Sequence, residues 1–468
     1  MRKLYLILIF LFILGFLIRF FPFRTDSDFH FWDETVYLQH AEILSGYRED
    51  NYDEFDFRPP LLPVIIALFY KLKHSVVIAH MIVALIASFG ILSTFFLAKT
   101  MFENEKIALI SAAILLLNPL HISLSHSILT DPLLPTFWCL TVLFLLLAIK
   151  RKSLIFYFLS GIFLGLSILL KFTSLQLVFY IVLTFLLISK LKRKNFLHEM
   201  KNLFLVFFAT FLVLLPYLIF SQIRFGFFLY TFIQQHTVVN WDVPTPWHTF
   251  YTQFFELFPP IFSLGILICI LSKIKDKRIS KKEVLLFIYI IIPFILLQTL
   301  VHKEIRFLLP ILPFLSISSA LGFSQLDLKN KNILILSVLA ILISVIFSLS
   351  HIQEIKGYLD WLKEKPAIMM AALWLKESTP KDSIVYNNFQ CVPLAYYSMR
   401  KINVLPFARN FQDELEKFMP QDGYLVYSSS SPKDKEPKLD FLMSDERFKL
   451  IKIFNDSREE VYIFQYSK

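Results

Sequence analysis

Residues 131–189 read DPLLPTFWCLTVLFLLLAIKRKSLIFYFLSGIFLGLSILLKFTSLQLVFYIVLTFLLIS, and this stretch decides the fold class. It consists of three apolar runs, separated by the basic residues at 150–152 and by Lys171. A run of this length and composition can cross the hydrocarbon core of a bilayer as a helix. The stretch therefore predicts three consecutive membrane-spanning helices.

The composition of the whole chain points the same way. Of its 468 residues, 56% are apolar and 18% are charged, whereas a soluble domain has about 45–50% apolar and about 25% charged residues. Further apolar runs lie at residues 4–22, 75–99, 107–119, 202–220, 259–272, 283–300, 305–323 and 332–349. We therefore expect a mainly α-helical, polytopic membrane protein with about eleven spans. The first run is kept as a helix because no cleavage site follows it.

The run at residues 60–73 decides on which side of the membrane each later loop lies. If it lies along the outer surface as a helix and the N-terminus is inside, twenty lysines and arginines fall on inner loops, and nine on outer loops before the C-terminal tail. The positive-inside rule favours this distribution. It predicts a multi-pass protein of the plasma membrane with a cytoplasmic N-terminus and an outer tail, and it explains the net charge of +10 without nucleic acid.

The last part of the chain has the composition of a soluble domain. Segments rich in β-prone residues alternate there with helix-like segments, which is typical of an α/β domain. The strand-like segments are residues 383–386, 401–405, 424–428, 448–454 and 460–464. We expect a membrane domain over residues 1–350, with surface helices in an outer loop at 23–74, and an extracytoplasmic α/β domain over residues 351–468. The three cysteines indicate neither a disulfide framework nor a cysteine metal site.

Acidic residues stand at the borders of apolar segments. Asp33 and Glu34 lie in FHFWDETVYLQHAEIL (29–44), whose spacing predicts an amphipathic helix. A partly desolvated carboxylate there is a candidate general base; the alternative is an acid that binds free backbone N–H groups at a helix start. Asp131, followed by Pro132, has the pattern of an N-cap. The predicted topology sets Asp131 on the same face as Asp33, so the two could converge on one site.

Basic residues gather at the same outer border. HKEIRF (302–307) puts His302, Lys303, Glu304 and Arg306 in one short turn ahead of an apolar run. Such a turn is a candidate phosphate or pyrophosphate site, with interfacial anchoring as the alternative. Arg58, placed at the outer border by the following Pro59-Pro60, could bind a lipid phosphate through two hydrogen bonds, with snorkelling as an equal alternative. Weaker members of this basic set, which anchoring would also explain, are Lys171 and Arg224. No Walker loop, dinucleotide glycine pattern, HExxH or CxxC occurs, so neither a nucleotide loop nor a metal site is predicted.

The order of these motifs resembles that of a known class of membrane enzymes. The motifs are WDE at 32–34, RPPLLP at 58–63, TDPLL at 130–134, KF at 171–172 and HKEIRFLLPILPF at 302–314. Together they resemble the GT-C class of polyprenyl-phosphate-dependent glycosyltransferases, and the nearest branch looks like the protein O-mannosyltransferase and aminoarabinose-transferase (PMT-like) group. HKEIRF is also similar to the HKExRF signature of the mannosyltransferases that extend dolichol-linked and GPI glycans, so two branches stay open.

The resemblance implies catalytic roles for the acids. Asp33 corresponds to the acid taken as the catalytic base, with Glu34 beside it, and Asp131 to an acid on the acceptor side. In an inverting transfer, Asp33 would take the proton from an acceptor hydroxyl as that hydroxyl attacks the anomeric carbon. No cofactor is implied for certain; a divalent cation could bind the acidic loop, although Asp33, Glu34 and Asp131 show no metal-ligand spacing.

The resemblance also implies the donor and the residues that bind it. The donor would be a sugar linked to dolichyl, undecaprenyl or another polyprenyl phosphate, with its tail among the membrane lipids. The acceptor would be an extracytoplasmic protein, lipid or glycan. His302, Lys303 and Arg306 would face the lipid phosphate, and Arg58 stands where such proteins commonly have a lysine.

Two other classes of protein compete with this interpretation. A secondary transporter would carry ionisable residues near the bilayer midplane and broken helices in matched halves, whereas nearly all charges here lie at the ends of runs. A membrane-anchored binding protein could act through its C-terminal domain, yet about eleven spans are more than anchoring requires. We therefore expect a glycosyltransferase.

Overall fold

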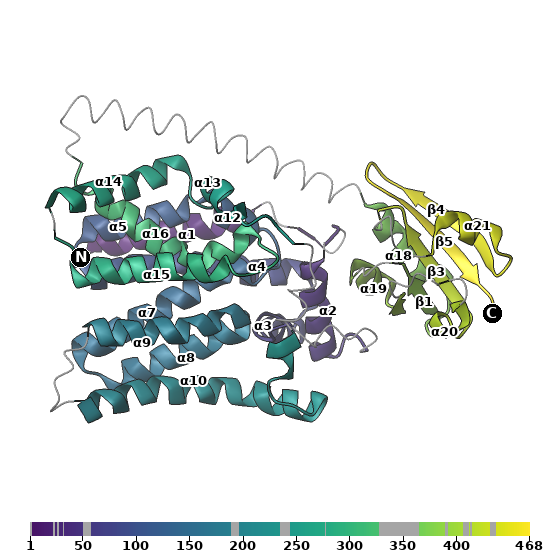
Figure 1. Cartoon of the computed structure of the whole chain (residues 1–468), viewed down its shortest axis with the longest axis horizontal. Helices are drawn as coiled ribbons and strands as arrows, with labels where there is room; N and C mark the ends of the chain where they lie inside the picture. Colours follow the sequence, from purple (N-terminus) through teal and green to yellow (C-terminus); the bar gives the residue numbers. More distant parts are fainter. Residues whose placement is uncertain are drawn as a thin grey trace. The chain divides into compact units, whose positions relative to one another are not determined.

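The computed structural model of the protein forms two compact units (Figure 1). It describes residues 2–21, 24–25, 28–30, 32–49, 58–188, 196–234, 244–276, 278–326, 365–388, 392–405, 411, 414–430 and 437–468. Unit 1 consists of Met1–Arg24, Phe55–Ile65 and Val77–Ile355. Unit 2 consists of Thr25–Glu54, Ile66–Val76 and Lys356–Lys468. Parts of the first loop therefore group with the C-terminal segment.

Unit 1 is built from helices, because a backbone in hydrocarbon must satisfy its hydrogen bonds within one segment. Its elements are α1 (Arg2–Phe20), α4 (Val76–Phe102), α5 (Glu105–Leu116), α6 (Pro119–Ser125), η1 (Asp131–Leu133), α7 (Leu134–Arg151), α8 (Leu154–Leu170), η2 (Phe172–Leu175), α9 (Gln176–Ile188), α10 (Phe196–Phe225), α12 (Thr249–Thr252), α13 (Phe254–Leu257), α14 (Pro260–Asp276), α15 (Lys281–Leu297), η4 (Ile305–Ile311) and α16 (Leu312–Phe323). A further helix, α3 (Leu61–Tyr70), begins in unit 1 and ends in unit 2.

The predicted apolar runs coincide with these helices wherever the runs fall in the described residues. The run at 332–349 lies outside them. By length and composition, five described helices could cross a membrane: Arg2–Phe20, Val76–Phe102, Asp131–Arg151, Met200–Phe225 and Ile305–Phe323. α5 and α6 pass the same test together, as one span bent by 53°. The prediction of a mainly α-helical, polytopic membrane protein is confirmed.

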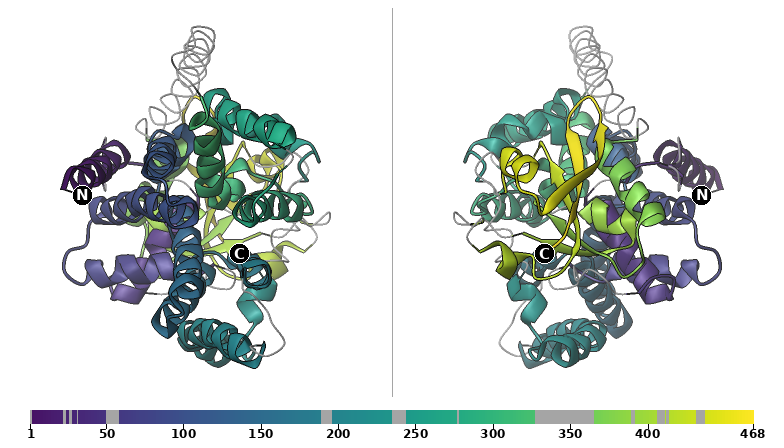
Figure 2. Two further views of the ribbon diagram at one scale, coloured as in Figure 1. Left: turned by 90° about the vertical axis from the view of Figure 1, so that its left-hand side faces the viewer. Right: turned by 90° about the vertical axis from the view of Figure 1, so that its right-hand side faces the viewer.

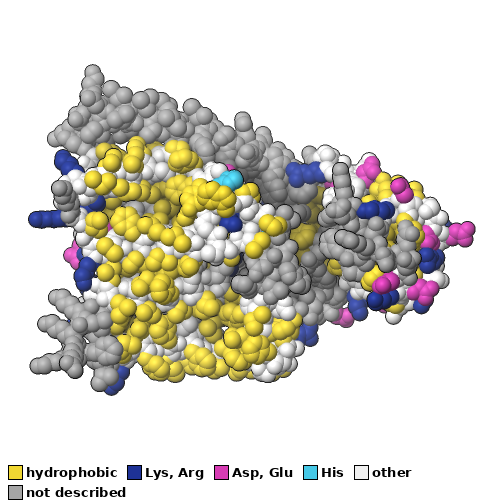
Figure 3. Space-filling model, in the orientation of Figure 1, with side chains coloured by type: hydrophobic (Ala, Val, Ile, Leu, Met, Phe, Trp, Pro, Cys, Tyr) yellow, Lys and Arg dark blue, Asp and Glu magenta, His cyan; other side chains and the backbone are white. Residues whose placement is uncertain are grey.

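The surface of unit 1 agrees with a membrane setting. Figure 3 shows hydrophobic side chains spread over the helices of this unit, while the lysines and arginines on this face gather mainly beyond the helix ends. Seen along the helices in Figure 2, unit 1 is a bundle whose members lie side by side. An apolar belt around a helical bundle is what lipid-facing surfaces require.

The turns that we predicted to face the cytoplasm gather at one end of unit 1. Lys150, in the last turn of α7, pairs with Glu103 in the turn between α4 and α5. At the same end, the Lys281 ammonium at the start of α15 donates to the Leu187 carbonyl in the last turn of α9. The N-terminus also lies at this end (Figure 1). That this end faces the cytoplasm stays a prediction.

Glycines allow two helix pairs of unit 1 to touch at their backbones. A Cβ added at Gly322 in α16 would lie 1.8 Å from the Gly265 carbonyl oxygen in α14. A Cβ at Gly161 in α8 would lie 2.1 Å from the Val206 carbonyl oxygen in α10. In lipid, helices associate through close packing rather than through a hydrophobic driving force, so small residues at these contacts set the spacing of the bundle.

Replacing Gly322 by Ala should therefore destabilise the protein, although alanine is normally the better helix former. The added methyl group must push α14 and α16 apart, and overpacking of this kind costs about 1–3 kcal/mol. Thermal unfolding of the purified protein in nanodiscs measures the effect. Leu267→Ala, at an exposed position of α14, is the control and should change the unfolding temperature less than G322A.

The C-terminal segment of unit 2 is an α/β domain, as predicted. Its sheet has the order β2-β1-β3-β5-β4, formed by β1 (Ile384–Asn387), β2 (Lys401–Val404), β3 (Gly423–Ser428), β4 (Phe448–Asn455) and β5 (Glu460–Tyr466). β1 pairs in parallel with β2 and β3, and β5 pairs antiparallel with β3 and β4. The helices are α18 (Ala367–Ser378), α19 (Val392–Ser398), α20 (Leu415–Phe418) and α21 (Leu439–Ser444).

Both faces of this sheet are covered. Tyr386, Leu425 and Phe464 pack with side chains of α20 and α21 in one apolar core. Their chain neighbours in the strands, such as Val385 and Val426, are also buried and point to the opposite face, because side chains alternate along a strand. α18 packs against β4 and β5. The sheet therefore forms the centre of a layered domain.

The first loop adds α2 (Asp33–Ser45) to unit 2, where it packs on α19. The helix predicted at this position is present, but its predicted amphipathic pattern is wrong. Every residue from 34 to 42 is buried, so this stretch of the helix has no exposed polar face, whereas the apolar Leu44 is exposed. The helix ends at Gly46, whose φ of 84° is a left-handed conformation that glycine adopts easily.

Candidate functional site

Three charged side chains of unit 1 come from turns that lead into apolar helices. Asp131 is the first residue of η1, Lys171 precedes η2, and Arg306 is the second residue of η4. η1 and η4 lie against each other. Because each turn enters a helix at the same end of the bundle, residues far apart in the sequence come together there.

Asp131 and Lys171 form the buried part of the site. The Lys171 ammonium donates to Asp131 Oδ1 at 2.6 Å, and the Asp131 side chain is only 3% exposed. The Arg306 guanidinium lies 3.9 Å from Asp131 Oδ2. A buried carboxylate needs such compensation, since an unpaired charge in apolar surroundings is costly.

Arg306, Glu304 and His302 form the outer part of the site. Arg306 Nη2 donates to Glu304 Oε1 at 2.8 Å, and Arg306 Nε lies 2.6 Å from Glu304 Oε2, so both carboxylate oxygens face the guanidinium as an ion pair. His302 Nε2 lies 3.2 Å from Glu304 Oε1. The Glu304 side chain is 37% exposed, so the site opens at Glu304 and closes at Asp131. We call these five residues, Asp131, Lys171, His302, Glu304 and Arg306, the ion cluster.

The charges of the ion cluster act on Glu304. Burial alone would raise the pKa of its carboxyl, and this is the largest single influence. The positive charge and hydrogen bonds of Arg306, the charge of Lys171 and the hydrogen bond with His302 outweigh it, so the pKa of Glu304 is lowered. Glu304 is therefore an anion that occupies the guanidinium of Arg306.

Phe307 supports the cations, and the sequence analysis did not single it out. The Lys171 ammonium lies 4.5 Å from the centre of its ring, and the Arg306 guanidinium carbon lies 5.8 Å from it. Cations gain electrostatic stabilisation over an aromatic face, and more so where water is excluded. The sequence did contain a signal for this role, because Phe307 is the last residue of HKEIRF. We interpreted only the charged residues of that motif.

A second support comes from α1 and α6, through Arg19 and His121. Arg19 donates to His121 Nδ1, with its Nη2 2.9 Å away, and to the Leu115 and Leu116 carbonyls at the end of α5. A guanidinium can only donate, so Nδ1 accepts and the His121 proton lies on Nε2. His121 Nε2 then donates to the Pro132 carbonyl at 3.0 Å. This fixes the backbone next to Asp131, and no short-range sequence pattern indicates it.

The N-cap interpretation of Asp131 is not what the structure has. The N-cap position of η1 is Thr130, with no capping hydrogen bond from its side chain, and Asp131 accepts from Lys171 instead. Lys303 is buried; its ammonium donates to the Leu300 carbonyl at 2.6 Å and its backbone N–H to Thr245 Oγ1 at 2.8 Å. It braces the turn that carries His302 and Arg306.

The remaining predicted site residues lie on other elements. Arg58 is half-buried just before α3, and Arg224 is exposed in the last turn of α10. Asp33 and Glu34 belong to unit 2, where they form the first turn of α2; Asp33 is half-buried and Glu34 is buried. Acids at this place interact favourably with the helix dipole.

Removing the carboxylate charge of Asp131 should cost about 3–5 kcal/mol of stability, because the Lys171 ammonium, whose side chain is only 13% exposed, loses its partner. Asp131→Asn should therefore unfold at a clearly lower temperature than the wild type in nanodiscs. Glu103→Gln is the control, since its pair with Lys150 is exposed and surface pairs contribute little. Equal unfolding temperatures for D131N and E103Q would contradict the assignment of a buried pair.

Comparisons with known proteins agree with the fold and the motifs. Residues 57–220 match the family model described as dolichyl-phosphate-mannose-protein mannosyltransferase. GPI mannosyltransferase 3 from Debaryomyces hansenii is 23% identical over 409 residues, which are 80% of this chain and 71% of that protein.

Solved structures show the same fold. ArnT from Cupriavidus metallidurans bound to undecaprenyl phosphate matches with a TM-score of 0.69 at 14% identity, over 99% of this chain and 98% of that chain. The archaeal oligosaccharyltransferase AglB from Archaeoglobus fulgidus was solved in complex with an inhibitory peptide and a dolichol-phosphate. It matches with a TM-score of 0.63 at 13% identity, over 91% of this chain and 69% of that chain. The prediction of a glycosyltransferase is confirmed, and the alternatives of a transporter and an anchored binding protein are set aside: the chain is a multi-pass membrane glycosyltransferase, similar to the PMT-like group of the GT-C class.

Proposed function

We propose that the protein transfers a sugar from a polyprenyl phosphate to an acceptor outside the cytoplasm. The observation that carries the proposal is the ion cluster, in which Lys171 and Arg306 are held at the end of apolar helices. A donor that is itself a lipid would keep its tail in the bilayer and present its phosphate at this level. The ligands named for the similar structures, undecaprenyl phosphate and dolichol-phosphate, support this donor class.

Arg306 is proposed as the main phosphate ligand. Glu304 occupies its guanidinium through two oxygens, the geometry in which a phosphate would also bind. Glu304 is the most exposed member of its pair, so it can turn outward when a phosphate takes its place, and His302 lies beside it. Lys171, fixed by Asp131, adds a second cation behind Arg306. Lys303 and Arg58 complete the proposed set, by their likeness to the family motifs.

Asp33 is proposed as the general base, with Glu34 as its neighbour. The acceptor hydroxyl would give its proton to Asp33 while its oxygen forms a bond to the anomeric carbon. The bond from that carbon to the phosphate oxygen would break, and its electron pair would leave with the polyprenyl phosphate. Preorganised cations would stabilise this developing charge. Asp131 keeps Lys171 oriented, which is a supporting role within the ion cluster.

Asp33→Asn should lower the transfer rate by about 10²–10⁴-fold, the usual contribution of a general base. The assay follows radiolabelled sugar from synthetic polyprenyl-phosphate donors to cell-envelope acceptors, with the purified protein in nanodiscs. It is run with and without EDTA, because the acidic loop could hold a divalent cation. Glu49→Gln, an exposed acid after α2, should keep the wild-type rate. A wild-type rate for folded D33N would remove the base assignment.

Arg306→Ala should raise the apparent KM for the donor by roughly ten- to a hundredfold, because hydrogen bonds between charged groups are worth about 1.5–3 kcal/mol. Arg306→Lys should recover only part of this loss, since an ammonium cannot form the bidentate pair. The control is Arg278→Ala, at an exposed position between α14 and α15. An unchanged donor KM in R306A would contradict the phosphate assignment.

A further inference from the structure

The proposed base is carried by a helix that cannot fix its own position. α2 has thirteen residues, and isolated helices of about this length are marginal in water. Its N-cap residue, Trp32, has φ 35° and ψ −102° and makes no capping hydrogen bond through its side chain. Asp33 therefore stands at the start of a short helix whose N-cap side chain forms no capping bond, and we expect its position to depend on what the helix packs against.

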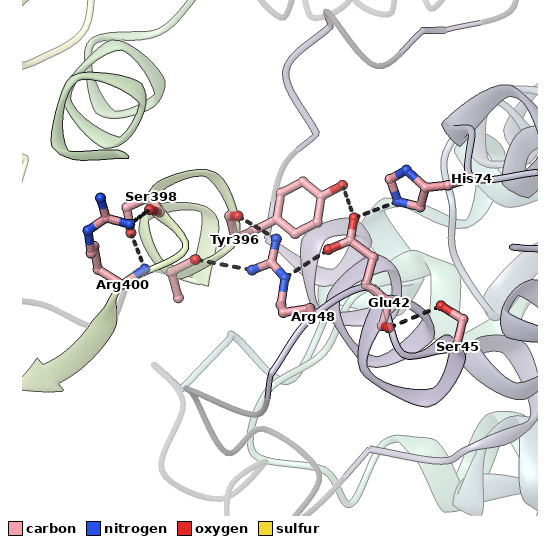
Figure 4. Close-up of polar contacts among 8 residues, drawn as sticks. Glu42, Ser45, Arg48, His74, Tyr396, Ser398 and Arg400 are labelled. Atoms are coloured by element: carbon pink, nitrogen blue, oxygen red, sulfur yellow. Dashed lines mark hydrogen bonds and ion pairs between the residues drawn. The ribbon is translucent and has the colours of Figure 1, made fainter. Parts of the chain in front are cut away.

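One attachment lies at the C-terminal end of α2 (Figure 4). Glu42 accepts from Arg48 Nε at 2.8 Å and from the Tyr396 hydroxyl at 3.2 Å. The same guanidinium donates to the Ala395 carbonyl at 3.3 Å and to the Tyr396 carbonyl at 2.7 Å. The Arg48 and Glu42 side chains are only 5% and 7% exposed. Arg48 thus ties the exit of α2 to α19 of the C-terminal domain.

A second attachment lies on the other side of Asp33. The Tyr397 hydroxyl accepts from the His30 backbone N–H at 2.6 Å and donates to the Asp28 carbonyl at 3.3 Å. The Tyr397 ring stacks on Phe29, with the ring centres 5.7 Å apart. These contacts fix the stretch of chain that leads into α2. Neighbouring tyrosines of one short helix thus hold the chain before and after Asp33.

The chemistry of α19 suits these bonds. The Ala395 and Tyr396 carbonyls lie in its last turn, where helix carbonyls lack regular partners and the dipole favours a cation; Arg48 supplies it. Burial raises the pKa of Tyr396, and the charge of Glu42 raises it further. The phenol therefore keeps its proton and donates to Glu42.

α19 is itself anchored in its domain. Arg400, which follows it, donates to the Ser398 carbonyl and, at 2.7 Å each, to the Lys376 and Thr379 carbonyls at the end of α18. α18 packs on β4 and β5. A rigid connection therefore runs from the sheet through α18 and α19 to the two ends of α2.

We propose that Tyr397, Tyr396 and Arg48 are positioning residues for the glycosyl transfer, and that the C-terminal domain acts in the reaction by holding α2, and with it Asp33, in place. The inference rests on the proposed role of Asp33 as the base. None of the three residues is assigned a contact with the substrate. They act on the rate through Asp33, and the domain is part of the catalytic apparatus rather than an independent binding module.

The first test is Tyr397→Phe, which removes both hydrogen bonds of the hydroxyl and keeps the ring on Phe29. A small misplacement of a catalytic group can cost about 10²-fold, so we expect kcat to fall roughly ten- to a hundredfold with the donor KM within about twofold of the wild type. Tyr396→Phe should also lower kcat at a nearly unchanged donor KM, but by a smaller factor than Y397F. The matched control is Tyr462→Phe, whose hydroxyl bonds to the exposed side chain of Glu460. A wild-type kcat in Y397F would overturn the inference.

The second test separates positioning from general damage. If Tyr397 acts through Asp33, adding Y397F to D33N should leave the residual rate of D33N unchanged. Adding Y397F to R306A should lower kcat by the same factor as in the wild type. Equal losses in the D33N and wild-type backgrounds would overturn the inference. A wild-type rate for D33N alone would instead remove the proposed base.

Arg48 needs a variant that does not leave a buried charge behind. Arg48→Ala would take the guanidinium away from the buried Glu42 carboxylate, which would keep only the Tyr396 hydroxyl and His74 Nε2 as partners. Arg48→Met is therefore combined with Glu42→Gln. Hydrogen exchange of residues 28–48 should rise in this double variant, while exchange in β1 and β3 stays as in the wild type, and kcat should fall. Faster exchange of residues 28–48 with an unchanged kcat would contradict the positioning role.

Discussion

A charge placed among apolar helices must be compensated where it stands, and this constraint shapes unit 1. Asp131 meets it through Lys171, with Arg306 nearby. Arg19 meets it through His121 and the carbonyls at the end of α5. Both solutions join segments that are distant in the chain. These charged side chains therefore connect helices to one another as well as providing chemical groups. The geometry of a site built from them is determined by the helix packing.

The same principle explains why the site is closed at one end and open at the other. Asp131 is satisfied inside the protein, whereas Glu304 reaches solvent. A ligand that arrives from outside meets groups whose internal bonds are the easiest to replace. The buried pair of Asp131 and Lys171 would remain in place and keep Lys171 over the ring of Phe307, which Arg306 also contacts. If the ion cluster binds the phosphate as proposed, Glu304, Arg306 and His302 would serve recognition, while Asp131 and Lys171 hold the structure together.

Much of the fold could be predicted from the sequence, because apolar runs and alternating β-prone segments are local signals. The long helices of unit 1 and the strands of the C-terminal domain follow them, whereas the short α12 and α13 lie in a predicted loop. The ion cluster was predicted as separate pieces, since charge and position at a span border are also local. Its pairing was not predictable: Lys171 and Asp131 lie 40 residues apart. For Asp131 the local N-cap pattern was misleading, because a tertiary partner took its carboxylate.

What the sequence concealed was which segments belong together. The helix pattern at residues 29–44 suggested a surface helix with one apolar face, yet α2 is buried from Glu34 to Glu42 and belongs to a unit with the end of the chain. Its partners Tyr396 and Tyr397 lie more than 350 residues away. No spacing rule connects such segments, because their contact arises only when the sheet and α19 have formed.

The backbone contact between Gly265 and Gly322 restricts how α14 and α16 can move relative to each other. Where two backbones touch, no lipid chain or side chain can enter between them, and sliding would drive carbonyl oxygens into Cα atoms. α14 and α16 must therefore travel as one body. η4 continues directly into α16, so Arg306 moves together with α14 and α16. Any conformational change during the catalytic cycle must therefore occur in turns outside this helix pair.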